Sequence, residues 1–245
     1  MIIDGKKIAG EIVADIGDAL RGKTLGVVMN SGDAATQSFV KIKERVAERL
    51  GAALKRFSPK QIQDALQCDG IVVQLPIDNA EALLAQIPPQ KDVDSKPLPP
   101  VAAAVEEILK RAGVDAAGKK AIVVGEGRLV GKPVLELLRN LKADVHVVSL
   151  EQGSLTDLKD ADIVVSGAGS PGLIKPEMLK RGVVLIDAGT SEDTASAGRR
   201  IVGDCDPSCA SVASVFTPVP GGIGPIAVAM LFKNLATLVN KRQPL

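Results

Sequence analysis

The sequence is poor in aromatic side chains. Its 245 residues include 4 Phe but no Tyr and no Trp. Proteins hold single-stranded nucleic acids largely by stacking bases on aromatic rings, so this composition argues against such a function. A flat ligand would have to rest mainly on aliphatic side chains, on peptide planes or on one of the few Phe rings.

Histidine and cysteine are also scarce. His146 is the only histidine, which excludes histidine-based metal clusters and argues against a Ser-His-Asp triad. It lies in an alternating apolar pattern, and we assign it to one face of a strand. Three cysteines are too few for a disulfide framework, and their odd number leaves one thiol over. We expect no metal site and a reducing, cytoplasmic location.

The chain has no marked excess of charge. Its 30 Lys and Arg residues are mixed with 29 Asp and Glu residues, which gives a net charge of +1. This balance argues against a nucleic-acid surface and against a polybasic membrane anchor. We recognise no signal peptide and expect no apolar run of membrane-spanning length. We therefore expect neither nucleic acid nor membrane as a partner of this chain.

The most informative stretch runs from residue 120 to residue 133. It begins with Ala121-Ile-Val-Val124, an apolar segment typical of a strand buried on both faces of a parallel sheet. Gly125, Gly127 and Gly131 follow, and then an amphipathic helical pattern. Strand, glycine turn and helix predict a phosphate cradle, because glycines admit the pyrophosphate and the helix N-terminus offers free N–H groups. The spacing is not the commoner G-x-G-x-x-G, so a tight turn without a ligand stays an alternative.

Further strands are expected after this turn, at residues 144–149, 163–166, 183–187 and 201–205. Gly167-Ala168-Gly169 follows the second of these, where small residues would let a ligand pass close to the backbone. A stiff loop from Thr217 to Pro225 is rich in proline and glycine and precedes a helix at 226–240. It could bind a ligand at the helix start or serve only as a connection.

The N-terminal half combines helices with buried strands. We expect helices at 2–19, 36–50, 81–87 and 101–112, and strands at 24–29 and 69–76. Phe39 and Lys43 are four residues apart and would share one helix face, where a ring could support a flat ligand beside an ammonium group. A solvated lysine is the alternative. Gln74 ends the second strand, at the edge where ligands gather in open α/β sheets.

These elements predict an α/β protein of two domains with a cleft between them. Residues 1–115 would form an N-terminal three-layer α/β domain. Residues 116–225 would form a C-terminal Rossmann-type dinucleotide-binding domain. The last helix, within residues 226–245, is expected to pack back on the first domain.

Five separated parts of the chain match one family in content and in order. They are Gln37–Lys43, Asp69–Pro76, Lys91–Asp94, the glycine turn with Val123–Gly125 and Val130–Pro133, and Thr217–Pro225. Together they resemble the bifunctional methylenetetrahydrofolate dehydrogenase/cyclohydrolase family over nearly the whole chain. The strand ending in Val-Gln-Leu-Pro and the Pro-Gly-Gly loop are highly specific in combination.

The resemblance implies two activities on folate. The family oxidises 5,10-methylenetetrahydrofolate to 5,10-methenyltetrahydrofolate with NADP and hydrolyses the product to 10-formyltetrahydrofolate. The resemblance would make this chain an oxidoreductase and a hydrolase of one-carbon metabolism and purine biosynthesis. A cytoplasmic homodimer, with folate bound to the N-terminal domain, is expected on the same ground.

The resemblance also implies the site residues. Lys43 matches the catalytic lysine, and Gln74 and Asp94 match its partners. The residues expected to bind substrate are Phe39, Pro220 and Gly221. The residues expected to bind the dinucleotide are Gly125, Gly127, Arg128, Gly131, Gly167, Gly169, Thr217 and Gly224.

The chain departs from the family pattern at several positions. Phe39 stands where the family usually has tyrosine, so a ring can still stack but a hydroxyl relay is absent. Glu126 stands where an arginine would face a 2′-phosphate, and Glu151 stands where an acidic residue commonly binds the free ribose hydroxyls of NAD. We expect NADP, with Arg128 as its phosphate partner, and keep NAD as the alternative. The loop between Asp94 and residue 101 is also shorter than usual.

Other functions stay open at this point. The chain could be a dehydrogenase with weak or no cyclohydrolase activity, as the absence of a hydroxyl at Phe39 suggests. A non-catalytic dinucleotide-sensing module would be expected to lack Lys43, Gln74 or Asp94, and all three are present. A generic amino-acid or shikimate-type dehydrogenase would leave the Pro-Gly-Gly loop unexplained.

Overall fold

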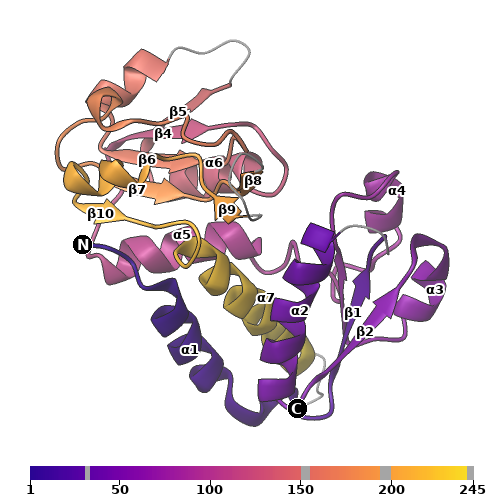
Figure 1. Cartoon of the computed structure of the whole chain (residues 1–245). Coiled ribbons are helices and arrows are strands. Elements are labelled where there is room, and N and C mark those ends of the chain that lie inside the picture. The colour runs from indigo at the N-terminus through magenta and orange to yellow at the C-terminus, as the bar shows by residue number, and fades with distance from the viewer. Residues whose placement is uncertain (31–33, 150–154, 194–199, 242–245) are drawn as a thin grey trace. The chain divides into compact units, whose positions relative to one another are not determined.

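The computed structural model of the chain describes residues 1–30, 34–149, 155–193 and 200–241, and its helices and strands alternate as in α/β proteins (Figure 1). The chain divides into two compact units. The alternation of helices and strands and this division confirm the predicted α/β fold of two domains. One unit consists of residues 1–8 and 101–227, and the other of residues 9–100 and 228–245. The helix α5 (Pro100–Arg111) falls almost wholly in the first of these units, whereas the sequence placed it in the N-terminal domain.

The unit formed by residues 9–100 and 228–245 contains a parallel sheet of three strands in the order β2–β1–β3. Its strands are β1 (Thr24–Val28), β2 (Ala53–Phe57) and β3 (Gly70–Val73). Four residues in each of β1 and β3 are buried, which explains their continuous apolar sequences. In β2 no residue is buried, and its edge position explains why no apolar run revealed it in the sequence.

Helices surround this sheet and carry part of the candidate site. They include α2 (Ala34–Arg49), α3 (Ile62–Ala65) and α4 (Ala80–Leu84). A core cluster joins Val28 of β1 with Ile71 and Val73 of β3, and Ile62 of α3 and Leu83 of α4 belong to it. Burial against this sheet therefore holds α3 and α4 in place.

Besides α5, whose first residue Pro100 falls in the other unit, two helices contribute residues to both units. They are α1 (Gly5–Ile16) and α7 (Ile223–Asn240). By length and composition alone α7 could cross a membrane, which corrects the expectation that no apolar run of that length is present. Its side chains include the fully buried Phe232 and Leu235, and 61% of the helix is buried inside the protein, as in the core helix of a globular protein.

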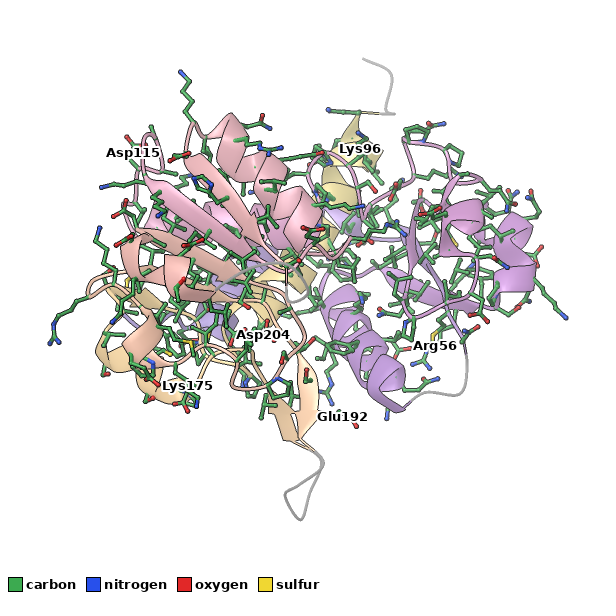
Figure 2. The ribbon with its side chains drawn as sticks, turned by 90° about the horizontal axis from the view of Figure 1, so that it is seen from above. Arg56, Lys96, Asp115, Lys175, Glu192 and Asp204 are labelled. Carbon is green, nitrogen blue, oxygen red and sulfur yellow. The ribbon has the colours of Figure 1, made fainter. Side chains whose placement is uncertain are left out.

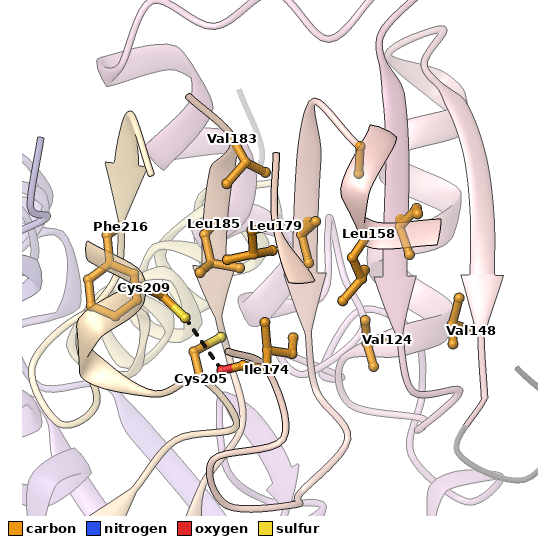
Figure 3. Close-up of a cluster of buried hydrophobic side chains, with 13 residues drawn as sticks. Val124, Val148, Leu158, Ile174, Leu179, Val183, Leu185, Cys205, Cys209 and Phe216 are labelled. Carbon is orange, nitrogen blue, oxygen red and sulfur yellow. Dashed lines mark hydrogen bonds between the residues drawn. The ribbon is translucent and has the colours of Figure 1, made fainter. Parts of the chain in front are cut away.

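The unit formed by residues 1–8 and 101–227 contains a parallel sheet of five strands in the order β10–β7–β6–β4–β5. The strands are β4 (Lys120–Val124), β5 (Asp144–Val148), β6 (Ile163–Ser166), β7 (Val184–Asp187) and β10 (Val215–Phe216). All of β6 and β7 is buried. A hydrophobic cluster on this sheet contains Ile122, Val164, Leu185 and Phe216 (Figure 3).

The predicted strand at 201–205 is wrong in its position and pairing. Residues Arg200–Val202 form β9, which pairs antiparallel with β8 (Ser191–Asp193) in a separate sheet of two strands. The fifth strand of the parallel sheet is β10, which has only two residues. A strand of two residues is too short to show apolar periodicity, which is why β10 was missed. The segment around Ile201 has the composition of a buried strand, but Ile201 is 40% exposed.

Helix α6 (Gly131–Asn140) follows β4, as the sequence predicted. Its buried face is formed by Val134, Leu137 and Leu138, which have the three- to four-residue spacing of an amphipathic helix. His146 lies on β5 and is exposed, with Nε2 at 3.3 Å from Oδ1 of Asp144. This confirms its assignment to a strand face.

Candidate functional site

Lys43 is a buried lysine on the inner side of α2. Its side chain is 9% exposed, and its Nζ donates a hydrogen bond of 2.6 Å to Oε1 of Gln74. Burial lowers the pKa of Lys43 below the usual value of a lysine, and the negative charge of Asp94 acts in the opposite direction. A lysine with a lowered pKa releases its proton more readily than a free lysine, which suits a proton relay.

Gln74 lies directly after β3, at the carboxyl end of the strand. Its backbone N–H donates to the carbonyl of Val28 at 2.8 Å, so the ladder with β1 continues one residue beyond β3. Its side-chain Nε2 donates to the carbonyl of Leu75 at 3.1 Å. This second bond turns Oε1 toward Lys43, because the amide can then present only its oxygen to the ammonium group.

Asp94 is held beside β3 by the loop that precedes it. The N–H of Ile71 donates to the carbonyl of Lys91 at 2.7 Å, and the N–H of Val93 donates to the carbonyl of Ile71 at 3.3 Å. Oδ1 of Asp92 accepts from the backbone N–H of Asp94 at 3.1 Å. The half-buried Asp94 is thus fixed by backbone contacts to the strand that also carries Gln74.

The structure therefore brings the three predicted catalytic residues together in one unit. Lys43 and Gln74 share a hydrogen bond, and the charge of Asp94 acts on the Lys43 ammonium. Phe39 lies one turn before Lys43 on α2 and is half-buried. The flank of this helix is fixed by Arg56, which pairs with Glu44 at 2.6 Å and is labelled in Figure 2.

Most of the other predicted residues lie in loops that follow strands of the five-stranded sheet. Gly125 directly follows β4 and has a φ of +95°, in the region that favours glycine. A Cβ on Gly131 would lie 2.2 Å from the carbonyl oxygen of Gly125, and a Cβ on Gly167 would lie 2.4 Å from Val130. The turn after β4, the start of α6 and the loop after β6 thus interlock through glycines.

This arrangement fits the close approach of a pyrophosphate group. Gly125 and Gly131 keep the turn tight, since a side chain at either position would meet main-chain atoms. A Cβ on Gly127 would meet no protein atom closer than 4.0 Å, so the backbone there is open to a ligand. Glu126, Gly127 and Arg128 form the exposed part of the turn. Gly169 has a φ of +67°, with nothing within 4 Å of the position of its Cβ. Glu151, the other residue on which the choice of cofactor depends, lies outside the described residues.

Two buried carboxylates, Asp187 and Asp204, hold the adjacent loops together, and no sequence motif identified either of them as a site residue. Asp204, which is labelled in Figure 2, is fully buried. It accepts hydrogen bonds from Oγ of Ser166 at 2.7 Å and from the N–H groups of Ala168 at 2.7 Å and Ser170 at 2.8 Å. It therefore fixes the loop Gly167–Gly169 directly. The only local sequence feature was an acidic residue between a glycine and a cysteine.

The second carboxylate, Asp187, ends β7 and is 1% exposed. It accepts hydrogen bonds from the N–H groups of Gly189 at 2.9 Å, Asp204 at 3.2 Å and Cys205 at 2.8 Å. Burial raises the pKa of Asp187 to about 6, and the charge of Asp204 contributes to the rise against the effect of these hydrogen bonds. Glycine is required beside the pair, because a Cβ on Gly203 would lie 2.1 Å from Oδ2 of Asp187.

Thr217 follows β10 and joins the proline-glycine loop to this network. It is fully buried, and its Oγ1 accepts a hydrogen bond of 2.7 Å from the N–H of Asp187. The carbonyl of Gly221 accepts from the N–H of Gly5 at 2.9 Å, and a Cβ on Gly5 would lie 1.7 Å from the carbonyl oxygen of Gly222. Pro220 is exposed, and Gly224 is an exposed residue in the first turn of α7.

The described residues offer no metal site. Among them, no three His, Cys, Asp or Glu side chains are grouped so that they could hold an ion. Cys68, Cys205 and Cys209 are all free and buried. Burial raises the pKa of Cys209 to about 11 and raises that of Cys205 as well, so neither is an activated nucleophile. Cys209 donates instead to the carbonyl of Ile174 at 3.4 Å (Figure 3).

Comparison with known proteins gives consistent matches. Residues 99–243 match a family described as tetrahydrofolate dehydrogenase/cyclohydrolase, NAD(P)-binding domain. The bifunctional protein FolD of Halothermothrix orenii is 36% identical over 276 residues, which cover 95% of each chain.

Two solved structures are similar over almost the full length of the chain. The N5,N10-methylenetetrahydrofolate dehydrogenase-cyclohydrolase of Trypanosoma brucei, complexed with NADP cofactor and inhibitor, has a TM-score of 0.89 and 31% identity, covering 98% of this chain and 97% of its own. The bifunctional enzyme FolD of Campylobacter jejuni has a TM-score of 0.90 and 26% identity, covering 99% of both chains.

Proposed function

Because the chain belongs to the tetrahydrofolate dehydrogenase/cyclohydrolase family, we propose that it carries out both reactions of that family. It oxidises 5,10-methylenetetrahydrofolate to 5,10-methenyltetrahydrofolate with NADP, and it hydrolyses the product to 10-formyltetrahydrofolate. The observation that carries this proposal is the buried Lys43, hydrogen-bonded to Gln74 and subject to the charge of Asp94. A dinucleotide-sensing module would have no use for a buried lysine of lowered pKa.

The dehydrogenase step requires positioning more than acid or base chemistry. Bound NADP supplies the hydride acceptor for the methylene carbon, and a folate nitrogen stabilises the cation that remains. The residues of the chain hold the two reactants. Gly125, Gly131 and Gly167 let the loops assigned to the dinucleotide pack closely on one another. Thr217 fixes the proline-glycine loop through its hydrogen bond from Asp187, and we assign Pro220 and Gly221 of that loop to the substrate.

The cyclohydrolase step requires a proton relay, and Lys43 supplies it. The neutral amine accepts a proton from water as the new C–O bond forms at the methenyl carbon. The resulting ammonium protonates the folate nitrogen as the C–N bond breaks. The hydroxyl proton of the tetrahedral adduct then passes to the amine and on to solvent. Gln74 orients the Lys43 side chain through its 2.6 Å hydrogen bond, and Asp94 binds the amino edge of the pterin.

The test combines absorbance assays of both steps with the variant Lys43→Met. Wild-type protein is expected to reduce NADP with methylenetetrahydrofolate and to release no methenyl product. The variant is expected to reduce NADP and to accumulate methenyltetrahydrofolate, because hydride transfer does not need the amine. Wild-type hydrolysis in the variant would remove Lys43 from the mechanism. Failure of the wild-type protein to reduce either NADP or NAD would refute the folate assignment.

One observation favours the alternative of a dehydrogenase with weak cyclohydrolase activity. Phe39 has no hydroxyl group and lies one turn from Lys43 on α2. If a hydroxyl is needed in the relay, wild-type protein accumulates methenyl product and Phe39→Tyr removes that product faster. If Phe39→Tyr leaves the hydrolysis rate unchanged, the ring serves only to stack on the substrate, and the bifunctional assignment is retained.

The cofactor preference depends on the exposed turn after β4. We assign the 2′-phosphate of NADP to Arg128, which is exposed beside the exposed Glu126. We further propose that residues 1–115 with 226–245 bind folate and residues 116–225 bind the dinucleotide. A cytoplasmic homodimer acting in purine biosynthesis completes the proposal, and light scattering of the purified protein tests the oligomeric state.

A further inference from the structure

We propose that Asn234 on α7 is a positioning residue that holds Asp94 in place for the reaction on folate. This inference rests on the proposed function, since it assigns a task to a residue that supports the substrate-binding carboxylate. Asn234 is 4% exposed and lies far from Asp94 in the sequence. Nothing in the sequence pattern of α7 distinguishes it from the polar positions of an ordinary helix.

Asn234 clamps the segment that contains Asp94. Its Nδ2 donates to the carbonyl of Val93 at 2.9 Å and to the carbonyl of Leu98 at 2.8 Å. These two carbonyls bracket residues 94–97. One amide group, with two N–H donors in a fixed plane, thus fixes both ends of a short irregular loop. The first residue inside the clamp is Asp94.

The other side of the same segment is fixed by β3. The N–H of Val93 donates to Ile71, and Val93 is fully buried. A Cβ on Gly70 would lie 2.5 Å from Cδ1 of Leu235 and 2.6 Å from Cγ1 of Val93. The start of β3, the residue before Asp94 and the residue after Asn234 are therefore in close contact, and glycine at position 70 permits it.

The contacts of residues 93–98 with β3 and α7 connect Asn234 to Lys43. Gln74 continues from β3 and bonds to Lys43, while Asp94 is held between β3 and α7. Displacing residues 94–97 would move the Asp94 carboxylate without moving Gln74 or Lys43. Replacing Asn234 is therefore expected to impair folate binding and turnover selectively, and to leave the dinucleotide-binding loops unaffected.

The experiment compares Asn234→Ala with Leu238→Ala in the full chain. Leu238 is buried on α7 one turn beyond Asn234 and is not among the residues assigned to the site, so its variant serves as the control for lost stability. Asn234→Ala is expected to lower kcat/KM for methylenetetrahydrofolate on the order of tenfold to a hundredfold, mainly through KM, because a small misplacement of a binding group has a large effect. KM for NADP is expected to stay within about twofold of wild type. Leu238→Ala is expected to lower the melting temperature and to change neither KM.

A double-mutant cycle decides whether Asn234 acts through Asp94. If it does, adding Asn234→Ala to Asp94→Asn lowers kcat/KM for folate little further than Asp94→Asn alone. Fully additive losses would overturn the proposal, as would wild-type folate kinetics in Asn234→Ala. Equal increases in KM for methylenetetrahydrofolate and for NADP would also overturn it, because they would show that Asn234 supports the fold as a whole.

Amide hydrogen exchange separates this proposal from the proposed function. Loss of Asn234 is expected to increase exchange in residues 93–98 while the protection of β4, β6 and β7 stays at its wild-type level. Unchanged exchange in residues 93–98 would refute the clamp even if the enzyme is active. A wild-type protein without activity would refute the proposed function, and faster exchange in the variant would still support the clamp.

Discussion

Replacing Asp187 with asparagine removes the charge of a buried carboxyl group at the end of β7 and keeps nearly the same shape. The pKa of Asp187 rises from 3.8 to about 6, chiefly because the side chain is buried. A rise of about two pKa units corresponds to about 3 kcal/mol of free energy between the two protonation states. The charged form of Asp187 therefore destabilises the folded protein at neutral pH.

The sign follows from proton binding. Between pH 3.8 and about 6 the folded protein keeps the proton on Asp187, whereas the unfolded chain has lost it. The folded state thus binds more protons, and its stability falls as the pH rises through this interval. The folded protein is expected to lose roughly 1 kcal/mol of its stability through Asp187 between pH 5 and pH 7.

The assay is native-state hydrogen exchange of the buried amides in β6 and β7, at pH 5 and pH 7, for wild type and Asp187→Asn. The variant's stability relative to wild type is expected to increase by roughly 1 kcal/mol from pH 5 to pH 7. Comparing the two proteins cancels the carboxylates that titrate in both, such as Asp162, whose pKa is lowered mainly by its hydrogen bond from Lys180. A relative stability that is constant or falls with pH would refute the account of Asp187.

Three further predictions concern the dinucleotide loops. Gly131→Ala is expected to raise KM for NADP tenfold or more, on the order expected for a displaced binding loop, because its Cβ would lie 2.2 Å from the carbonyl oxygen of Gly125. The control Gly10→Ala, with nothing within 4 Å in helix α1, should stabilise the protein by about 1 kcal/mol without affecting KM. Asp204→Asn is expected to lower the free energy of unfolding by about 2–3 kcal/mol and to raise KM for NADP, because the carboxylate accepts three hydrogen bonds. An unchanged KM would show that the loop Gly167–Gly169 does not bind the cofactor. Arg128→Glu should lower kcat/KM for NADP on the order of tenfold to a hundredfold while sparing NAD, and an equal loss with both cofactors would place the 2′-phosphate elsewhere.

The sequence was informative wherever burial is continuous. The strands β1, β3, β4, β6 and β7 have apolar sequences because both of their faces are covered. Four of them were predicted to within one residue at each end, whereas the strand predicted at 69–76 runs three residues past the end of β3. The edge strand β2 and the two-residue strand β10 were missed because neither has an apolar pattern. Periodicity detects burial, and these strands are half-exposed or too short to show it.

The site was predictable from the sequence only in part. Motifs identified Lys43, Gln74 and Asp94, and the structure places them in one unit. Asp204 and Asn234 were not identified, because their partners are 34 to 38 and 136 to 141 residues away in the chain. A polar residue whose hydrogen-bond partners lie so far away in the chain has no local sequence pattern that reveals its role. Only the folded chain shows which loops these side chains hold.

The first residues of the chain have a consequence for solubility. The N–H of Ile3 donates to the carbonyl of Phe216 at 2.9 Å, and the N–H of Phe216 donates to the carbonyl of Met1 at 2.9 Å. These bonds cover the outer edge of β10, which would otherwise offer its backbone groups to any extended peptide. Removing residues 1–4 would therefore expose a template for edge-to-edge association between molecules. At the opposite edge of the same sheet, β5 carries the exposed Asp144, whose charge discourages such pairing.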